Sequence, residues 1–153
     1  MFARLFREDL IMERRRPRTL PSRPLVLLVD GHDETLALYA IALSGMGFDV
    51  IPAKDSAEGF SRAWGLHPDI IVTELVLRHT SGWELLERLK DEPRTRDIPV
   101  VVLTENAQSA AHERARRSGC VALFVKPCLP GRLGIELRRL LVLQPRSHAS
   151  ASH

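Results

Sequence analysis

Five short apolar segments recur along the chain, and each has the pattern of a buried strand. The clearest runs from Leu25 to Val29 and ends at Asp30 and Gly31. A continuous apolar run of this length is typical of a strand that is buried on both faces. Similar runs predict further strands over 48–53, 70–73, 100–104 and 121–125.

The segments between these runs have helical periodicity. In the first of them Leu36, Ala40 and Leu43 are expected on one face, with Asp33 as the N-cap. Ser56 is the expected N-cap of the second helix. The pattern predicts helices over 34–44, 56–64, 81–90, 107–118 and 133–143.

Strand and helix therefore alternate five times, which predicts a doubly wound α/β domain. Each crossover between parallel strands must be right-handed, so helices are expected on both faces of a five-stranded parallel sheet. Ligands of such sheets bind at the carboxyl ends of the strands. The polar residues at those ends are Asp30, Glu74, Thr104 and Lys126.

Composition fits one folded domain with a tail at each end. The 153 residues are 44% hydrophobic and 27% charged, as in an average globular protein. Residues 1–24 hold seven Arg and three acidic residues, whereas residues 25–143 hold 14 basic and 16 acidic residues. We expect a folded domain over 25–143, a basic and disordered extension over 1–24, and a polar, disordered tail over 144–153. Met12 offers a second start besides Met1.

Several protein classes do not fit the sequence. No apolar run approaches the roughly 18 residues of a membrane span, and the N-terminus lacks the apolar stretch of a secretory signal. The two cysteines, Cys120 and Cys128, are too few for a disulfide framework, and the six histidines show no paired metal-ligand spacing. We therefore expect a cytoplasmic protein that makes no membrane contact.

Four motifs in order resemble the CheY-like receiver domain of bacterial response regulators, over about residues 25–143. They are LVLLVDGHDE at the first strand, PDIIVTELVLRHTSGWELLERLK around the third, RDIPVVVLTENA at the fourth and ALFVKPC at the fifth. The resemblance implies a flavodoxin-like sheet with strand order 2-1-3-4-5.

The resemblance also implies phosphoryl chemistry at the carboxyl edge of the sheet. In receivers an aspartate after the third strand takes a phosphoryl group from a histidine kinase or a phosphotransfer protein, with Mg²⁺ neutralising the oxygens. By position, Asp30 corresponds to a metal ligand, Thr104 to the hydroxyl that binds the phosphoryl oxygen and Lys126 to its ammonium partner. A cis peptide bond between Lys126 and Pro127 is expected to aim the lysine.

Three positions depart from the receiver pattern. Glu74 stands at the phosphoacceptor position, and its extra methylene moves the carboxylate oxygens by about 1 Å, a shift that can cost about a hundredfold in rate. Gly31 replaces the second acid after the first strand, so we expect weak Mg²⁺ binding at Asp30. Leu123 stands at the switch position, where receivers usually carry an aromatic residue.

Two interpretations of Glu74 stay open at this point. Its permanent charge lies near Lys126 and so substitutes for a phosphorylated aspartate or fixes one conformation. Alternatively, the site has decayed and the pairing of Glu74 with Lys126 is only structural. The sequence does not say whether Glu74 mimics the active or the resting state.

The leading hypothesis is a stand-alone signalling module that is not an enzyme and acts through protein contacts. The expected partners are a histidine kinase, a phosphotransfer protein or an output protein, bound over about residues 107–143, where the arginines favour an acidic partner. One alternative is a working phosphoacceptor that takes the group with Mg²⁺. A second is a nucleic-acid-associated protein that acts through its basic arm, although the acidic domain argues against nucleic acid. Homodimerisation stays open.

Overall fold

The predicted five-stranded parallel sheet is present in the computed structural model, which describes residues 3–5 and 22–143. The parallel strands lie side by side in the order β3-β2-β4-β5-β6. Counted without β1, this is the expected order 2-1-3-4-5, so the prediction is confirmed. The strands are β2 (Leu25–Val29), β3 (Asp49–Ala53), β4 (Ile70–Thr73), β5 (Val100–Thr104) and β6 (Ala122–Val125).

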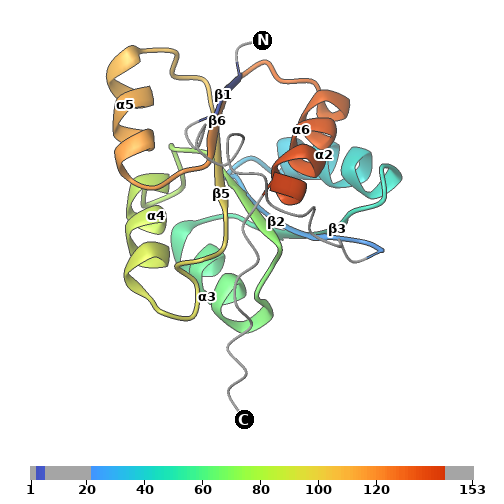
Figure 1. Ribbon diagram of the computed structural model, residues 1–153, viewed down its shortest axis with the longest axis horizontal. Coiled ribbons are helices and arrows are strands. Elements are labelled where there is room, and N and C mark those ends of the chain that lie inside the picture. Colours follow the sequence, from blue (N-terminus) through green and yellow to red (C-terminus); the bar gives the residue numbers. More distant parts are fainter. Residues whose placement is uncertain (1–2, 6–21, 144–153) are drawn as a thin grey trace.

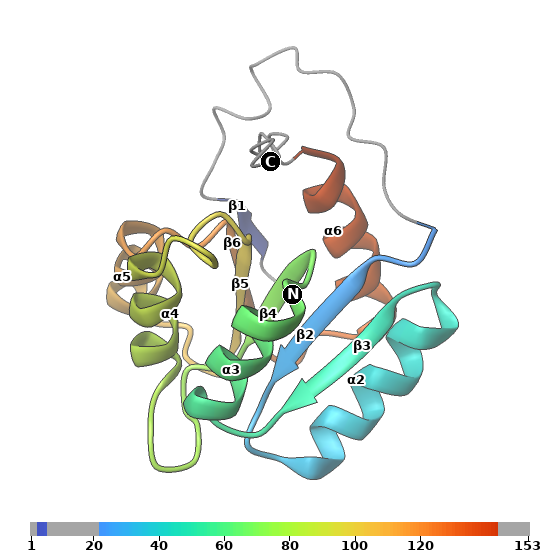
Figure 2. The same ribbon diagram turned by 90° about the horizontal axis from the view of Figure 1, so that it is seen from below.

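Five helices cover the two faces of this sheet. They are α2 (Asp33–Gly45), α3 (Ser56–Leu66), α4 (Gly82–Asp91), α5 (Ser109–Arg117) and α6 (Pro130–Leu143). Helices α2 and α6 lie on one face and α3, α4 and α5 on the other (Figures 1 and 2). No helix within residues 22–143 combines the length and apolarity needed to cross a membrane.

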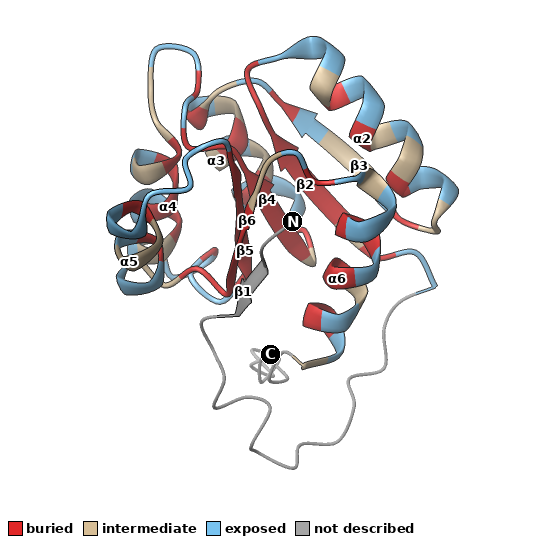
Figure 3. Cartoon of the chain, turned by 90° about the horizontal axis from the view of Figure 1, so that it is seen from above, coloured by how far each residue is buried: buried red, intermediate tan, exposed pale blue. Residues whose placement is uncertain are grey.

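Two apolar cores, one on each face, explain the continuous apolar strands. Leu28 on β2 belongs to the core under α2 and α6, while its neighbour Leu27 belongs to the core under α3, α4 and α5. Successive side chains of a strand point to opposite faces, so a strand inside both cores needs an apolar residue at every position. Figure 3 shows the resulting buried layer through β2, β4 and β5.

A sixth strand, β1 (Ala3–Leu5), was not predicted. It pairs antiparallel with β6 at one edge of the sheet (Figures 1 and 2). The expected disorder over 1–24 therefore does not hold for these three residues, which are too few for a recognisable strand pattern. Residues 6–21 of that extension and the tail over 144–153 lie outside the described residues.

The helix ends correct several expectations. His32 and not Asp33 occupies the N-cap of α2, without a side-chain cap, so Asp33 is the first helical residue. Asp55 and not Ser56 caps α3, because its carboxylate accepts a hydrogen bond from the Glu58 N–H at 2.8 Å. Helix α3 also continues past Trp64 to Leu66, α5 begins at 109 instead of 107, and α6 begins at 130 instead of 133.

Gly82 fixes the loop that follows β4 against the start of α4. Its N–H donates to the Leu75 carbonyl at 2.8 Å, and the Ser81 side chain caps the helix by accepting from the Glu84 N–H. A Cβ atom on Gly82 would lie 2.3 Å from the Glu74 carbonyl oxygen. Only glycine allows this close approach, which places Glu74 at the edge of the sheet.

Replacing Gly82 by alanine is therefore expected to destabilise the domain by about 1–3 kcal/mol, because backbone must move to admit the methyl group. Gly65→Ala is the matched control, since nothing lies within 4 Å of its Cβ position and α3 gains a better helix former. Urea unfolding of both variants measures the difference. Equal stability of the two would contradict the close approach at Gly82.

Candidate functional site

Three charged side chains meet at the carboxyl edge of the sheet. Asp30 follows β2, Glu74 follows β4 and Lys126 follows β6. The Lys126 Nζ lies 3.0 Å from Asp30 Oδ2 and 3.0 Å from Glu74 Oε2. We call these three residues the carboxylate–lysine cluster. The sequence placed each of them at this edge, and the structure brings them into direct contact.

Both carboxylate oxygens of Glu74 have a partner. Oε2 takes the ion pair with Lys126, and Oε1 accepts a hydrogen bond from the Leu75 N–H at 2.7 Å. The residue is only 6% exposed. A buried carboxylate with both oxygens engaged is held in one orientation, because turning it would break a charge-assisted hydrogen bond.

Lys126 carries one positive charge between two negative ones. Burial acts to lower the pKa of Lys126, but its hydrogen bonds to Asp30 and Glu74 and their charges outweigh this effect and raise the pKa above 10.5. A raised pKa means that the ammonium stabilises the fold at every pH below 10.5 and that this contribution is lost only as the pH rises through the higher folded value. The ammonium is therefore fully charged near neutral pH.

Asp30 is held from two sides. Its Oδ2 pairs with Lys126, and its Oδ1 accepts a hydrogen bond from the His32 N–H at 2.9 Å. The His32 ring Nδ1 also lies 3.0 Å from Oδ1, so this histidine contacts the cluster. The Asp30 side chain is 4% exposed, and its two oxygens are both in use.

The residues present do not fit a receiver-type Mg²⁺ site. Gly31 brings no carboxylate, and a Cβ at this position would meet Arg78 Cγ at 3.3 Å. Within residues 22–143 no group of three or more His, Cys, Asp or Glu side chains is arranged to hold a metal ion. The two remaining carboxylates share one ammonium, which is an ion-pair arrangement and leaves no oxygen cage.

Thr104 and Leu123 lie near the cluster without joining it. The Thr104 hydroxyl accepts from the Asn106 N–H at 3.2 Å, and its carbonyl accepts from the Lys126 N–H at 2.7 Å. Leu123 is fully buried in the core under α4 and α5, whereas Phe124 is buried in the opposite core, as alternation predicts. The expected cis peptide bond between Lys126 and Pro127 is present.

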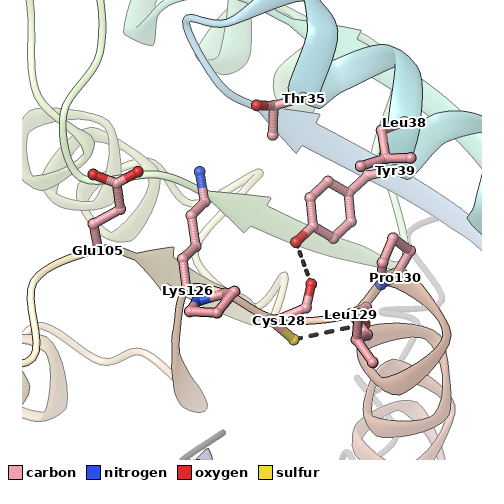
Figure 4. A pocket seen from close by; sticks show the side chains of 9 residues that line it. Thr35, Leu38, Tyr39, Glu105, Lys126, Cys128, Leu129 and Pro130 are labelled. Atoms are coloured by element: carbon pink, nitrogen blue, oxygen red, sulfur yellow. Dashed lines mark hydrogen bonds between the residues drawn. The ribbon is translucent and has the colours of Figure 1, made fainter.

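A cavity of about 500 Å³ borders the cluster, and Tyr39 is the residue there that the sequence analysis missed. Its hydroxyl donates to the Cys128 carbonyl and so ties α2 to the loop after β6 (Figure 4). Tyr39 takes the buried place on α2 that was expected for Ala40. Its spacing from Leu36 and Leu43 was the available signal, because residues three and four apart share a helix face. The cavity is lined by Thr35, Leu38, Tyr39, Glu105, Lys126, Pro127, Cys128, Leu129 and Pro130.

Comparison with known proteins assigns the chain to a family. The family model described as "Response regulator receiver domain" matches residues 26–138, which is most of the chain. The chain belongs to this family. It is therefore a response regulator receiver of two-component signalling.

Individual relatives agree with this assignment. The chain is 31% identical over 102 residues to the polar-differentiation response regulator DivK of Brucella ovis, covering 67% of this chain and 83% of the relative. The solved structure of the chemotaxis response regulator CheY4 of Vibrio cholerae superposes with a TM-score of 0.72 at 22% identity, covering 77% of this chain and 98% of that one. A CheY-like receiver from Methanospirillum hungatei JF-1 gives a TM-score of 0.75 at 22% identity, covering 80% and 97%. These two structures share the fold.

Lys126→Met is expected to destabilise the receiver by about 3–5 kcal/mol at pH 7, because two buried carboxylates lose their counter-charge. Lys54→Met, which removes an exposed lysine paired with Asp33, is the control and should change stability by less than about 1 kcal/mol. Denaturant unfolding of both variants at pH 7 measures the two losses, and an equal loss in the two variants would contradict the role of the cluster.

Proposed function

We propose that this receiver signals through protein contacts without conventional aspartyl phosphorylation. The observation that carries the proposal is the Lys126 ammonium, which is bound to both Glu74 and Asp30. In the phosphorylation chemistry of the family this ammonium neutralises the incoming phosphoryl oxygens. Here the permanent charges of the chain already occupy it.

Glu74 is poorly suited to attack a phosphoryl donor. Attack needs a carboxylate oxygen that is free, aligned with the phosphorus and served by a cation. Neither oxygen of Glu74 is free, and the side chain is one methylene longer than aspartate. With Gly31 in place of an acid, the part of the chain that the structure describes has no group of three His, Cys, Asp or Glu side chains arranged to hold a divalent cation.

We infer that the cluster holds the receiver in one conformation. Glu74 supplies the negative charge that Lys126 would otherwise find on a phosphoryl group or an aspartate. Leu123 at the switch position is fully buried and has no hydroxyl or ring to exchange between two environments. Signalling then depends on how much of the protein is present and on which partner binds it.

The surface proposed for partners is residues 107–143, which we call the 107–143 surface. It holds seven basic and two acidic residues, a net charge of +5, whereas residues 25–106 hold seven basic and 14 acidic residues. A cytoplasmic protein with an acidic docking face matches this charge. A histidine kinase, a phosphotransfer protein or an output protein of a two-component system would qualify.

A working phosphoacceptor is the second candidate, because three receiver positions, Asp30, Thr104 and Lys126, keep their residue types around Glu74. Incubation with acetyl phosphate and Mg²⁺ followed by intact-protein mass measurement separates the two. We expect the native chain to stay unmodified and the double variant Gly31→Asp/Glu74→Asp to gain about 80 Da, one phosphoryl group. A gain by the native chain would establish the second candidate and overturn the first.

The variant Glu74→Gln distinguishes a receiver that Glu74 holds in one conformation from a receiver whose site has decayed. It removes the charge of the side chain and keeps its size. If Glu74 fixes the conformation, amide hydrogen exchange over residues 122–128 should accelerate at least about tenfold, because Lys126 loses one of its two carboxylates. Glu84→Gln, an exposed residue of α4, is the control and should change nothing. Unchanged exchange in Glu74→Gln would favour decay.

A further inference from the structure

The strand that ends the parallel sheet, β6, has its outer edge covered by the chain's own N-terminal strand. The pairing joins Ala3 to Phe124, Arg4 to Leu123 and Leu5 to Ala122. An uncovered edge strand presents a row of backbone N–H and C=O groups that accept a further strand. The edge of β6 is therefore built to bind an extended segment, and β1 is the segment bound to it here.

This cover is short and easily separated from the rest of the fold. It comprises three residues, and β1 is the outermost strand of the sheet, adjoining β6 alone. Strand β6 keeps its other partner, β5, whether β1 is present or not. Removing β1 therefore costs the sheet only one short antiparallel pairing.

The residues around this edge are also mainly basic. Residues 107–143, which contain β6 and the helices beside it, hold six basic residues besides Lys126 and two acidic ones. On α5, Arg116 and Arg117 share the single carboxylate of Glu113, at 2.6 and 3.1 Å, which leaves a positive excess there. Charge complementarity therefore favours an acidic segment at this edge.

We propose that the β6 edge is a strand-addition site for an extended acidic segment of a partner protein, and that Ala3–Leu5 occupies it in cis as a displaceable cover. The proposal rests on the proposed function only in taking the 107–143 surface as the partner surface. A second copy of the chain is a poor occupant, because it would bring another net charge of +5 to the same edge.

Strand addition here would reach the carboxylate–lysine cluster directly. Arg4 of the cover stands opposite Leu123, the switch position, and β6 ends at Val125, one residue before Lys126. A segment bound along β6 therefore contacts the backbone that carries the lysine of the cluster. Partner binding and the state of the cluster share one strand.

The cover is tested by amide hydrogen exchange on the full chain and on a chain that starts at Met12 and so lacks β1. Loss of β1 should accelerate exchange over residues 122–125 at least about tenfold, because outward N–H groups lose their acceptors. Strand β3 at the opposite edge (Asp49–Ala53) is the internal control and should not change. Equal exchange over 122–125 in the two chains would overturn the proposal.

The charge preference is tested in the full chain, where folding is not at risk. Arg4→Glu should slow exchange over residues 122–125 by about threefold or more at low salt, because the basic residues of 107–143 then attract the strand. Arg7→Glu makes the same change of charge beyond the strand and is the matched control. An equal effect of both variants would contradict pairing-specific recognition.

Binding is measured with fluorescent peptides of residues 1–10, one with the native sequence and one carrying Arg4→Glu. The chain that starts at Met12 should bind both, with the Glu peptide at least about fivefold tighter and the gap closing in 0.5 M salt. The full chain should bind each at least about fivefold more weakly, because β1 competes in cis. Absence of binding, equal binding by the two chains, or a dimer of the shorter chain in sedimentation would each overturn the proposal. None of these readouts depends on whether Glu74 accepts a phosphoryl group.

Discussion

The rest of the site depends on the contact between one ammonium and two buried carboxylates. Lys126 stands on the loop after β6, and its partners stand after β2 and β4, so the cluster ties three strand ends together at one edge of the sheet. In a buried position each of these charges would be costly alone, and each is tolerated because the others are within 3.0 Å.

The receiver fold explains why the cluster lies at the carboxyl edge of the sheet. A doubly wound sheet collects its polar residues at the carboxyl ends of its strands, since the strand interiors must be apolar on both faces. Family members use that edge for phosphoryl transfer. In this chain the same edge holds the ion pairs of Lys126 with Asp30 and Glu74.

The 107–143 surface shares β6 with the cluster. The strand carries Lys126 just beyond its end, and its outer edge pairs with Ala3–Leu5. The concentration of basic residues over 107–143, against an acidic remainder, gives this surface a charge that the whole-chain value of +3 conceals. A partner that recognises this strand edge and its charge would therefore act on the element that also positions the cluster.

The sequence by itself determined the order of the elements and the strand ends that hold the site. Period-two and period-3.6 patterns are local, so the five parallel strands, their helices and the residues Asp30, Glu74, Thr104 and Lys126 could be predicted from neighbouring residues alone. The four motifs, by their resemblance to receivers, added the strand order and the bond before Pro127.

The sequence already suggested that Glu74 pairs with Lys126, and the tertiary structure decided the other contacts. Lys126 also binds Asp30, whereas Thr104 turns to its own loop, and Tyr39 joins the site from a helix 89 residues before its partner Cys128. The strand at Ala3–Leu5 shows this most clearly. Three residues are too few to form a hydrophobic pattern, and they form a strand by pairing with the edge of β6. Contacts between residues far apart in the chain depend on packing distances, and no local pattern encodes those.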